Sequence, residues 1–399
     1  MEKAYSRVTA LASGTAMLLV NGLIYAWSIF SVPFSEQFGW SSAILGLCFT
    51  VILISFCFGG LLGGLITGRW GAGVSIPLGG AMSCSGFFLC VLLRADTVWL
   101  LYVCFSLAGL GVGIVYNAIM GAVVCRFPDK KGTASGIMLM GFGASSLLMG
   151  SAAAALMASP IGWKGTYAAT GAALLASAVI GGLFLRAPTP ARQEADSAPA
   201  EGLTPAEVIR TPSFWLYFMI SAIGCAFGAG IIGHARYIAL EAGAAASLAT
   251  LTVGLISVMN GLGRIFFGML YDRAGFRPAL LCDAAIFLAA GLSAILALKA
   301  AATWPALLAM MACGFSYGGV PTISSAATGE FFGPAWYGKN FSIVNLNIFP
   351  AAFASAIAGA MQTASGTYTG AFLLFMSLET VAAILILILG RVRKRLETR

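Results

Sequence analysis

The sequence predicts an all-α membrane protein with twelve transmembrane helices in two pseudo-symmetric bundles of six. Three observations lead to this fold class. The chain of 399 residues is 59% hydrophobic and only 9% charged, with a mean hydropathy of +0.93. Runs of about twenty apolar residues recur along its whole length, and each is long enough to cross the hydrocarbon core of a bilayer. The two halves of the chain also repeat one another.

Twelve apolar segments are separated by loops that carry most of the charge. A longer stretch between the sixth and seventh segments is rich in Pro, Ala and charged residues, which is typical of a linker. We therefore expect an N-terminal bundle over 1–186, a cytoplasmic linker over 187–210 with a short helix after Thr204, and a C-terminal bundle over 211–399. The expected spans lie near 8–33, 42–67, 74–93, 98–123, 133–157, 166–185, 211–235, 247–270, 278–298, 303–328, 340–362 and 367–390.

The distribution of basic residues predicts the orientation of these spans. With the N-terminus on the cytoplasmic side, seventeen of the 22 Lys and Arg residues fall in cytoplasmic segments, four fall outside, and Arg264 lies within a span. This bias follows the positive-inside rule, so we expect both termini to be cytoplasmic and the protein to reside in the cytoplasmic (inner) membrane. Orientation then explains the formal charge of +8 without a nucleic acid partner.

Two copies of one loop motif link the halves. The segment GLITGRWG begins at Gly64, and GMLYDRAG begins 204 residues later at Gly268. The segments GIVY at Gly113 and GFSY at Gly314 repeat at a similar offset. A duplication of six plus six spans around a long central loop is typical of a transporter with its site between two halves.

The second copy, Gly-x-x-x-Asp-Arg-x-Gly, is similar to the loop motif of the major facilitator superfamily. The resemblance covers the whole chain and implies an inner gate, in which residues of the motif bond across helix ends and hold the cytoplasmic side closed. Because the first copy has Gly68 where the second has Asp272, we expect the gating bond to be asymmetric between the halves. The candidate gate residues are Gly64, Arg69, Gly268, Asp272, Arg273 and Arg277.

Further segments resemble the oxalate/formate antiporter family, and most closely its bacterial monocarboxylate-transporter branch. They include NGLIYAWSIFSVPF, RFPDKKGTASGI and FWLYFMISAIGCAFGAGIIGHA. The resemblance implies a secondary transporter that works by alternating access and is not an enzyme. An integral-membrane enzyme or sensor is also disfavoured because the spans contain no nucleophile–base pair and no soluble domain is visible. Scattered cysteines and a single histidine predict neither a metal site nor a cofactor.

Arg264 is the candidate substrate-binding residue. An arginine at the centre of a spanning helix costs about 2.5–3.5 kcal/mol on insertion scales, so it usually faces a cavity or a partner. Its guanidinium presents a planar fork of donors that matches a carboxylate. Asn260 lies four residues earlier on the same helix face, where it can orient the guanidinium or contact substrate. The alternative is that Arg264 reaches toward the cytoplasmic boundary of the bilayer.

At Asn260 this sequence departs from the pattern of the monocarboxylate transporters. Monocarboxylate transporters have a similar pair, an acid and an arginine four residues apart in the same helix. Asn260 replaces that acid in this chain, so a proton step assigned to the acid has no counterpart at this position.

Other polar residues within the spans are further candidates for substrate binding. His234 ends the seventh span after a glycine-rich stretch, and it either joins the site or faces outer water. Tyr116, Tyr317 and Tyr25 can each offer one hydroxyl group to a substrate, or can bond between packed helices.

Two acids lie within predicted spans. Glu379 is in the middle of the twelfth span, and together with His234 it is a candidate for proton coupling, with a structural role as the alternative. Asp283 lies near the start of the ninth span, and we expect it to join Arg273 or Arg277 in the inner gate.

The number of buried cations predicts the charge of the substrate. The resemblance implies that antiporters for oxalate carry a second basic residue within span eleven, and this chain has none at that position. One cation matches one negative charge, because a second unpaired carboxylate would be costly in a low-dielectric cavity.

We therefore predict proton-coupled symport of small monocarboxylates such as lactate or pyruvate, with a small carboxylate and protons as partners. We expect a monomer in the lipid bilayer, with no nucleic acid partner. Anion exchange of the oxalate/formate type and efflux of non-carboxylate compounds are the alternatives.

Overall fold

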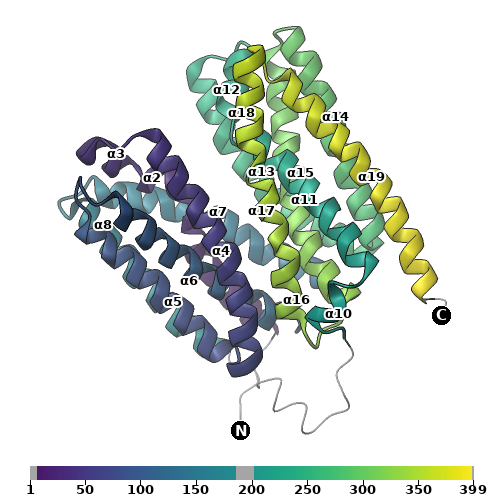
Figure 1. The fold of residues 1–399 in the computed structure, drawn as a ribbon, viewed down its shortest axis with the longest axis horizontal. Helices are drawn as coiled ribbons and strands as arrows, with labels where there is room; N and C mark the ends of the chain where they lie inside the picture. The colour runs from purple at the N-terminus through teal and green to yellow at the C-terminus, as the bar shows by residue number, and fades with distance from the viewer. Residues whose placement is uncertain (1–6, 186–201, 398–399) are drawn as a thin grey trace. The chain divides into compact units, whose positions relative to one another are not determined.

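Figure 1 shows the computed structural model, which describes residues 7–185 and 202–397, with the side chains of 24, 25, 28, 42, 43, 250 and 394–397 excluded. Every regular element in this part of the chain is a helix. The elements before the central linker are α1 (Arg7–Asn21), η1 (Gly22–Ala26), α2 (Trp27–Phe30), α3 (Val32–Phe38), α4 (Ser42–Trp70), α5 (Ala72–Leu89), η2 (Cys90–Leu92), α6 (Val98–Val124), α7 (Lys131–Met157) and α8 (Gly162–Phe184).

The elements after the linker begin with α10, a short helix that directly follows Thr204. They are α10 (Pro205–Val208), α11 (Pro212–Ile232), α12 (Ala235–Glu241), α13 (Ala246–Ala274), α14 (Phe276–Lys299), α15 (Thr303–Phe331), α16 (Tyr337–Val344), η3 (Asn345–Asn347), α17 (Ile348–Ala351), α18 (Ala354–Ser365) and α19 (Thr369–Glu397).

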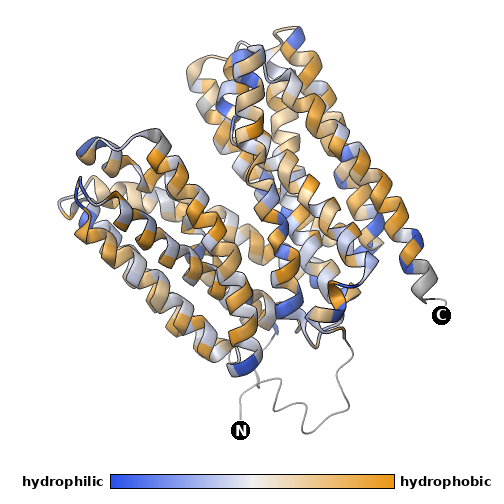
Figure 2. Cartoon of the chain, in the orientation of Figure 1, coloured by the Kyte–Doolittle hydropathy of each residue, from blue (hydrophilic) through white to orange (hydrophobic). Residues whose placement is uncertain are grey.

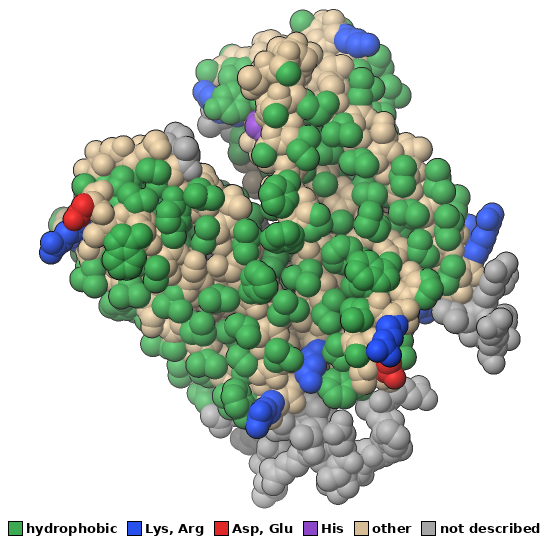
Figure 3. Space-filling view, viewed as in Figure 1, with side chains coloured by type: hydrophobic (Ala, Val, Ile, Leu, Met, Phe, Trp, Pro, Cys, Tyr) green, Lys and Arg blue, Asp and Glu red, His purple; other side chains and the backbone are tan. Residues whose placement is uncertain are grey.

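Eleven helical segments in the described part of the chain are long and apolar enough to cross a membrane. They correspond to eleven of the twelve predicted spans, and the chain is an integral membrane protein. Apolar residues dominate these helices in Figure 2. In Figure 3, hydrophobic side chains cover the visible flanks of the helices in each unit, while Lys and Arg lie mostly near helix ends. This pattern suits flanks that face lipid and ends that face water.

The first predicted span, 8–33, differs from the expected single helix. It is divided among α1, the 3₁₀ helix η1, α2 and α3. Gly22 lies where the break begins, and a Cβ at this position would be 2.0 Å from the carbonyl oxygen of Phe142. The glycine therefore permits a close backbone contact at a point where the α-helix tightens into a 3₁₀ turn.

The contacts between residues divide the chain into two compact units. Unit 1 contains Met1–Pro128, Gly141–Thr204 and Gly329–Ile343, and unit 2 contains Asp129–Met140, Pro205–Thr328 and Val344–Arg399. The start of α7 is thus grouped with the C-terminal helices, and most of α16 with the N-terminal helices. The predicted division into 1–186, 187–210 and 211–399 stays a prediction, and residues 187–201 of the linker lie outside the described part of the chain.

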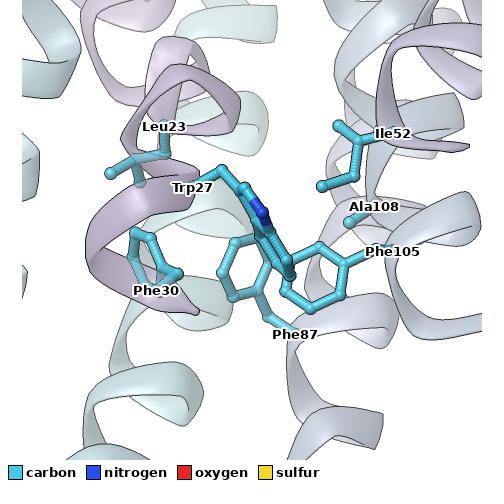
Figure 4. A pocket seen from close by; sticks show the side chains of 7 residues that line it. All are labelled: Leu23, Trp27, Phe30, Ile52, Phe87, Phe105 and Ala108. Carbon is cyan, nitrogen blue, oxygen red and sulfur yellow. The ribbon is translucent and has the colours of Figure 1, made fainter. Parts of the chain in front are cut away.

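The core of unit 1 is aromatic. Tyr167 is fully buried, and its hydroxyl donates a hydrogen bond of 2.5 Å to the carbonyl oxygen of Phe30. The rings of Phe30, Phe87 and Phe105 surround it, with centroids 5.3, 5.7 and 6.4 Å from that of Tyr167. A small pocket borders this cluster, as Figure 4 shows, and its lining has no charged side chain that would neutralise an anion. It is lined by Leu23, Trp27, Phe30, Ile52, Phe87, Phe105 and Ala108.

The core of unit 2 brings α11, α14 and α19 side by side. Phe227 of α11 and Phe287 of α14 stack with ring centroids 4.7 Å apart, and Phe375 of α19 lies 5.8 Å from Phe227. All three rings are buried. These contacts fix the positions of the helices that carry the buried polar groups of this unit.

The internal repeat is visible in two equivalent helices. α4 and α13 each contain 29 residues, and their bounds differ by 204 positions. Each ends at a glycine with positive φ, Gly71 at 78° and Gly275 at 80°, and the next helix begins at the following residue. A residue with a Cβ rarely adopts this conformation, so both turns require glycine.

Candidate functional site

Arg264 is held inside unit 2 by two hydrogen bonds. It lies on α13 and is 6% exposed. Its Nε donates to Oδ1 of Asn260 at 2.9 Å, across the one turn that separates residues four apart. Its Nη1 donates to the backbone carbonyl oxygen of Leu139, which lies on α7. The Arg264–Asn260 contact inferred from the spacing is thus present.

The partners of this guanidinium carry no charge. An amide oxygen and a backbone carbonyl are its hydrogen-bond acceptors, and no acidic side chain pairs with Arg264 in the described part of the chain. A guanidinium has five N–H donors, so two bonds leave donors for another acceptor. A buried cation without a counter-ion is costly, and an anion with a planar pair of oxygens would offset that cost.

Close backbone contacts surround the turn of α13 that carries Arg264. A Cβ at Gly136 of α7 would lie 2.3 Å from the carbonyl oxygen of Arg264. A Cβ at Gly318 of α15 would lie 2.1 Å from the carbonyl oxygen of Asn260. These glycines let α7 and α15 approach α13 more closely than residues with side chains would allow, so the position of Arg264 is fixed from two sides.

Asp272, in the second copy of the loop motif, binds the start of α7. Its Oδ1 accepts from the backbone N–H of Gly132, and its Oδ2 accepts from that of Thr133, both at 2.7 Å. The first backbone N–H groups of a helix have no partner within the helix, and the helix dipole favours a negative charge there. A Cβ at Gly268 would lie 2.3 Å from the carbonyl oxygen of Gly132, so the glycine permits this contact.

The two arginines of this copy lie at the surface. Arg273 and Arg277 are both exposed. The side chain of Arg277 lies against α19, with its Cδ 3.2 Å from a Cβ placed at Gly390. Neither arginine contacts Asp272 through a hydrogen bond in the described part of the chain.

The first copy of the motif has different neighbours within unit 1. A Cβ at Gly64 would lie 2.9 Å from the carbonyl oxygen of Gly338, and one at Gly68 would lie 2.7 Å from Cε of Lys339. The Lys339 ammonium lies 4.3 Å from the ring centroid of Trp336. Arg69 is exposed, as is Arg273 at the equivalent position of the second copy. A lysine side chain therefore lies beside the position that is acidic in the second copy.

His234 belongs to a different cluster of unit 2. It separates α11 from α12, and its Nε2 lies 2.8 Å from the carbonyl oxygen of Ser355 while its Nδ1 lies 3.0 Å from the hydroxyl of Tyr368. Because a carbonyl oxygen only accepts, Nε2 donates; in the neutral ring, Nδ1 then accepts from Tyr368. The structure does not join His234 to Arg264 or Asn260 by a hydrogen bond in the described residues.

The hydroxyl of Tyr368 is suited to this donor role. Burial raises the pKa of the Tyr368 phenol, and the neighbouring Glu241 carboxylate raises it further. Glu241 Oε2 in turn accepts from the backbone N–H of Tyr368 at 3.1 Å. The phenol thus keeps its proton, and the cluster ties the α11–α12 junction to the turn before α19.

The three candidate tyrosines have different surroundings. Tyr116 is 4% exposed in unit 1, and its ring lies 5.2 Å from those of Phe56 and Phe142. Tyr317 is partly buried in unit 2, where Gly228 of α11 leaves room for its ring. The side chain of Tyr25 lies outside the described residues. A substrate role for each of them stays a prediction.

The two acids of the predicted spans are both buried in unit 2. Glu379 is 3% exposed and Asp283 is 4% exposed. The expectation that Asp283 joins Arg273 or Arg277 is wrong, because the structure gives it no such ion pair and its Oδ1 has no hydrogen-bond partner. Asp283 instead points into the interior of unit 2 toward α15, where a Cβ at Gly319 would lie 3.0 Å from its Oδ1.

Sequence reasoning missed three groups that the structure places at these positions. The carbonyl of Leu139 had no signal, because every residue has a carbonyl group and this one lies 125 positions from Arg264. Ser355 and Tyr368 lie beyond the histidine by 121 and 134 positions, and only the packing of α18 and of the turn before α19 brings them to it.

The fold and the buried cation of α13 define a helical membrane transporter. The Major Facilitator Superfamily profile matches residues 11–356, and the chain belongs to this superfamily. Its members move solutes and are not enzymes, so this chain is a transporter.

Two curated relatives match most of the chain. The oxalate:formate antiporter of Oxalobacter formigenes is 27% identical over 360 residues, which cover 86% of this chain and 82% of the relative. An uncharacterized MFS-type transporter of Escherichia coli, YhjX, is 26% identical over 82% of this chain and 80% of its own length.

A solved structure supports the predicted fold class. FucP, an MFS transporter in the outward conformation, matches with a TM-score of 0.72 and 15% identity over 96% of this chain and 99% of FucP. The all-α fold of a twelve-span transporter is thus confirmed, although the first span is interrupted and the eleventh, 340–362, is divided among α16, η3, α17 and α18.

Proposed function

We propose that this protein is a secondary transporter that carries small monocarboxylates, such as lactate or pyruvate, together with protons by alternating access. The observation that carries the proposal is the buried guanidinium of Arg264, whose described partners, Asn260 and the Leu139 carbonyl, are both uncharged. A monocarboxylate would supply the missing counter-ion and the planar pair of acceptors. Symport of one proton with one monoanion moves no net charge, so the membrane potential does not oppose uptake.

Anion exchange of the oxalate/formate type is the second candidate. It is favoured by the similarity to the oxalate:formate antiporter of Oxalobacter formigenes over most of both chains. Both candidates use Arg264 in the same role. They differ in the coupling, because an exchanger needs an internal anion and a symporter needs a proton gradient.

The proposal includes an orientation and a gate. We place the protein in the cytoplasmic membrane as a monomer with both termini cytoplasmic, which the bias of basic residues supports. The bonds from Asp272 to the start of α7 support an inner gate at the second copy of the motif. His234 and Glu379 are the candidates for the proton-carrying group.

The test is uptake of labelled lactate into proteoliposomes by purified protein. Arg264→Ala is expected to lower the initial rate at least 100-fold, because the substrate would enter the site without a counter-charge. Arg264→Lys keeps the charge but loses the planar fork, so an intermediate rate is expected. Arg94→Ala, a change of an exposed arginine in unit 1, is the control and should keep the wild-type rate. An unchanged rate in Arg264→Ala would refute the site.

Counterflow separates the two couplings. An exchanger accumulates labelled anion in liposomes preloaded with unlabelled anion and does nothing in empty ones. A symporter accumulates it in empty liposomes when the outside is more acidic than the inside. Uptake into empty liposomes that follows the pH gradient would support symport, and strict dependence on internal anion would replace it with exchange.

A further inference from the structure

Two carboxyl groups are buried in unit 2, and neither pairs with a basic side chain among the described residues. Asp283 of α14 and Glu379 of α19 are 4% and 3% exposed. Oδ1 of Asp283 and Oε2 of Glu379 are both buried and have no hydrogen-bond partner. A buried polar atom without a partner is uncommon in a folded protein and calls for an explanation.

The two carboxyl groups belong to one region because α14 and α19 pack against each other in antiparallel register. Gly291 meets Met376, and Arg277 meets Gly390. In this register the position opposite Glu379 is only five residues from Asp283, which is roughly 7.5 Å along the helix axis. Side chains extend across part of that distance, and the two carboxyl groups interact electrostatically.

One face of α15 lines this region. The hydroxyl of Ser316 donates to the backbone carbonyl of Asp283 at 3.3 Å, and Gly319 leaves space for the Asp283 carboxyl group. Cys313 lies on the part of α15 near Glu379. Cys313, Ser316 and Gly319 follow at intervals of three residues and therefore share one helix face. The two acids thus lie along the same stripe of α15.

No basic side chain in the described residues pairs with either acid, and Arg264 of α13 bonds instead to Asn260 and the Leu139 carbonyl. The titratable groups near the acids are Tyr217 from α11, Cys282 from α14 and Cys313 from α15. α13 contributes the apolar Phe267, and α18 contains no titratable residue. The described residues also contain no group of three or more His, Cys, Asp or Glu side chains that could hold a metal ion.

We propose that Asp283 and Glu379 form a proton-binding site inside unit 2. Two ionised carboxylates in an apolar interior would repel each other and would lack any compensating charge. A bound proton removes a charge and turns one carboxylate oxygen into a donor. Because both groups lie in one apolar region, a negative charge on one disfavours a negative charge on the other.

A link between this site and transport rests on the proposed symport. Proton release from the pair would leave a negative charge in the same unit that holds Arg264. Occupancy of the pair by protons and occupancy of Arg264 by an anion would then favour one another, because together they keep the unit close to neutral.

The test is infrared spectroscopy of purified protein in lipid, without substrate. Wild type is expected to show the C=O stretching band of protonated carboxyl groups at neutral pH, with the small shift that deuterated water causes. Asp283→Asn and Glu379→Gln should each reduce the band, and the double variant should remove it. The surface pair Asp96→Asn with Glu330→Gln is the matched control and should leave the band unchanged. Both amides mimic the protonated form, so the variants should fold.

Three results would overturn the proposal. The first is a band that persists unchanged in the double variant, and the second is a wild type without the band. The third is a band that sodium removes at constant pH when it replaces choline, which would assign the pair to a metal cation.

A transport measurement tests the link separately. In the double variant, lactate counterflow without a pH gradient should continue, while accumulation driven by a pH gradient should fall at least tenfold. Unchanged gradient-driven accumulation would refute the link. Failure of wild type to carry any carboxylate would refute the proposed function, but it would leave the infrared result intact.

Discussion

α4 and α13 are equivalent helices of the internal repeat. They share their length and the way they end, but they differ in their polar side chains. Both contain 29 residues, end at a glycine with positive φ, and begin the next helix at once. Phe56 and Gly60 of α4 occupy the positions that are Asn260 and Arg264 in α13, 204 residues later. Phe56 packs against the ring of Tyr116 at 5.2 Å, whereas Asn260 binds a guanidinium.

In these two helices, the backbone contacts with neighbouring helices and the polar chemistry of the site vary independently. The most apolar stretch of α4 has a mean hydropathy of 2.4, and that of α13 has only 1.5. Two glycines of α4 that meet a neighbouring backbone, Gly59 and Gly64, are nevertheless retained as Gly263 and Gly268 in α13. α13 therefore carries polar side chains that α4 lacks, although both helices make close backbone contacts with their neighbours through glycines.

The largest loss of stability is expected at the glycines through which both helices contact a neighbouring backbone. A Cβ at Gly59 would lie 2.2 Å from the carbonyl oxygen of Leu110, and one at the equivalent Gly263 would lie 1.9 Å from that of Phe315. A backbone carbonyl cannot move aside like a flexible side chain, so Gly59→Leu and Gly263→Leu should each exceed the roughly 1–3 kcal/mol typical of overpacking. The yield of monodisperse protein in size-exclusion chromatography should fall at least tenfold in both.

Gly46→Leu and Gly254→Leu are the controls for this prediction, since nothing lies within 4 Å of a Cβ at either position. They should give a yield close to wild type. If Gly263→Leu lowered the yield and Gly59→Leu did not, the two helices would not depend equally on these close backbone contacts.

The next effect concerns the chemistry that only α13 carries. Asn260→Asp would place a carboxylate four residues from Arg264, where it would pair with the guanidinium and compete with the substrate. A hydrogen bond to a charged group is worth about 1.5–3 kcal/mol, so the apparent affinity for lactate should fall at least about tenfold. Asn260→Ala loses one neutral acceptor and should cost less, about fivefold. Concentration-dependent counterflow measures both affinities, and equal affinity in Asn260→Asp and wild type would contradict a substrate-binding role for the Arg264 guanidinium.

A smaller effect is expected at the loop motif. Asp272→Asn removes the charge from the two bonds to the start of α7 and should lower the midpoint of thermal unfolding by about 2–4 °C. Gly68→Asp places an acid at the equivalent position of α4, next to the flexible end of Lys339, and should change the midpoint by less than about 2 °C. A larger shift for Gly68→Asp than for Asp272→Asn would reverse the asymmetry between the two copies.

The smallest effect is expected at the α4 position that corresponds to Arg264. Nothing lies within 4 Å of a Cβ placed at Gly60. Gly60→Ala should therefore change stability by less than about 0.5 kcal/mol and leave lactate uptake at the wild-type rate. A loss of uptake with normal folding would show that the first copy also takes part in the site.

The sequence was sufficient for most of the helices, the repeat and the Arg264–Asn260 contact, because hydropathy, an offset of 204 and a spacing of four are all local or periodic signals. It failed for Asp283, whose burial depends on which face of α14 meets α15 and α19. Membrane helices are apolar on nearly every side, so their pattern does not reveal the buried face. The Leu139 carbonyl could not be predicted for a different reason, since no side chain marks a backbone acceptor.

The single glycine between α13 and α14 has a mechanical consequence. Because only Gly275, with a positive φ, separates the two helices, α13 and α14 have little freedom to move independently. A change in the tilt of α13 would therefore also displace the start of α14. Arg264 lies on α13 and Asp283 lies on α14, so one movement would shift both the buried cation and the buried acid without the involvement of a longer loop.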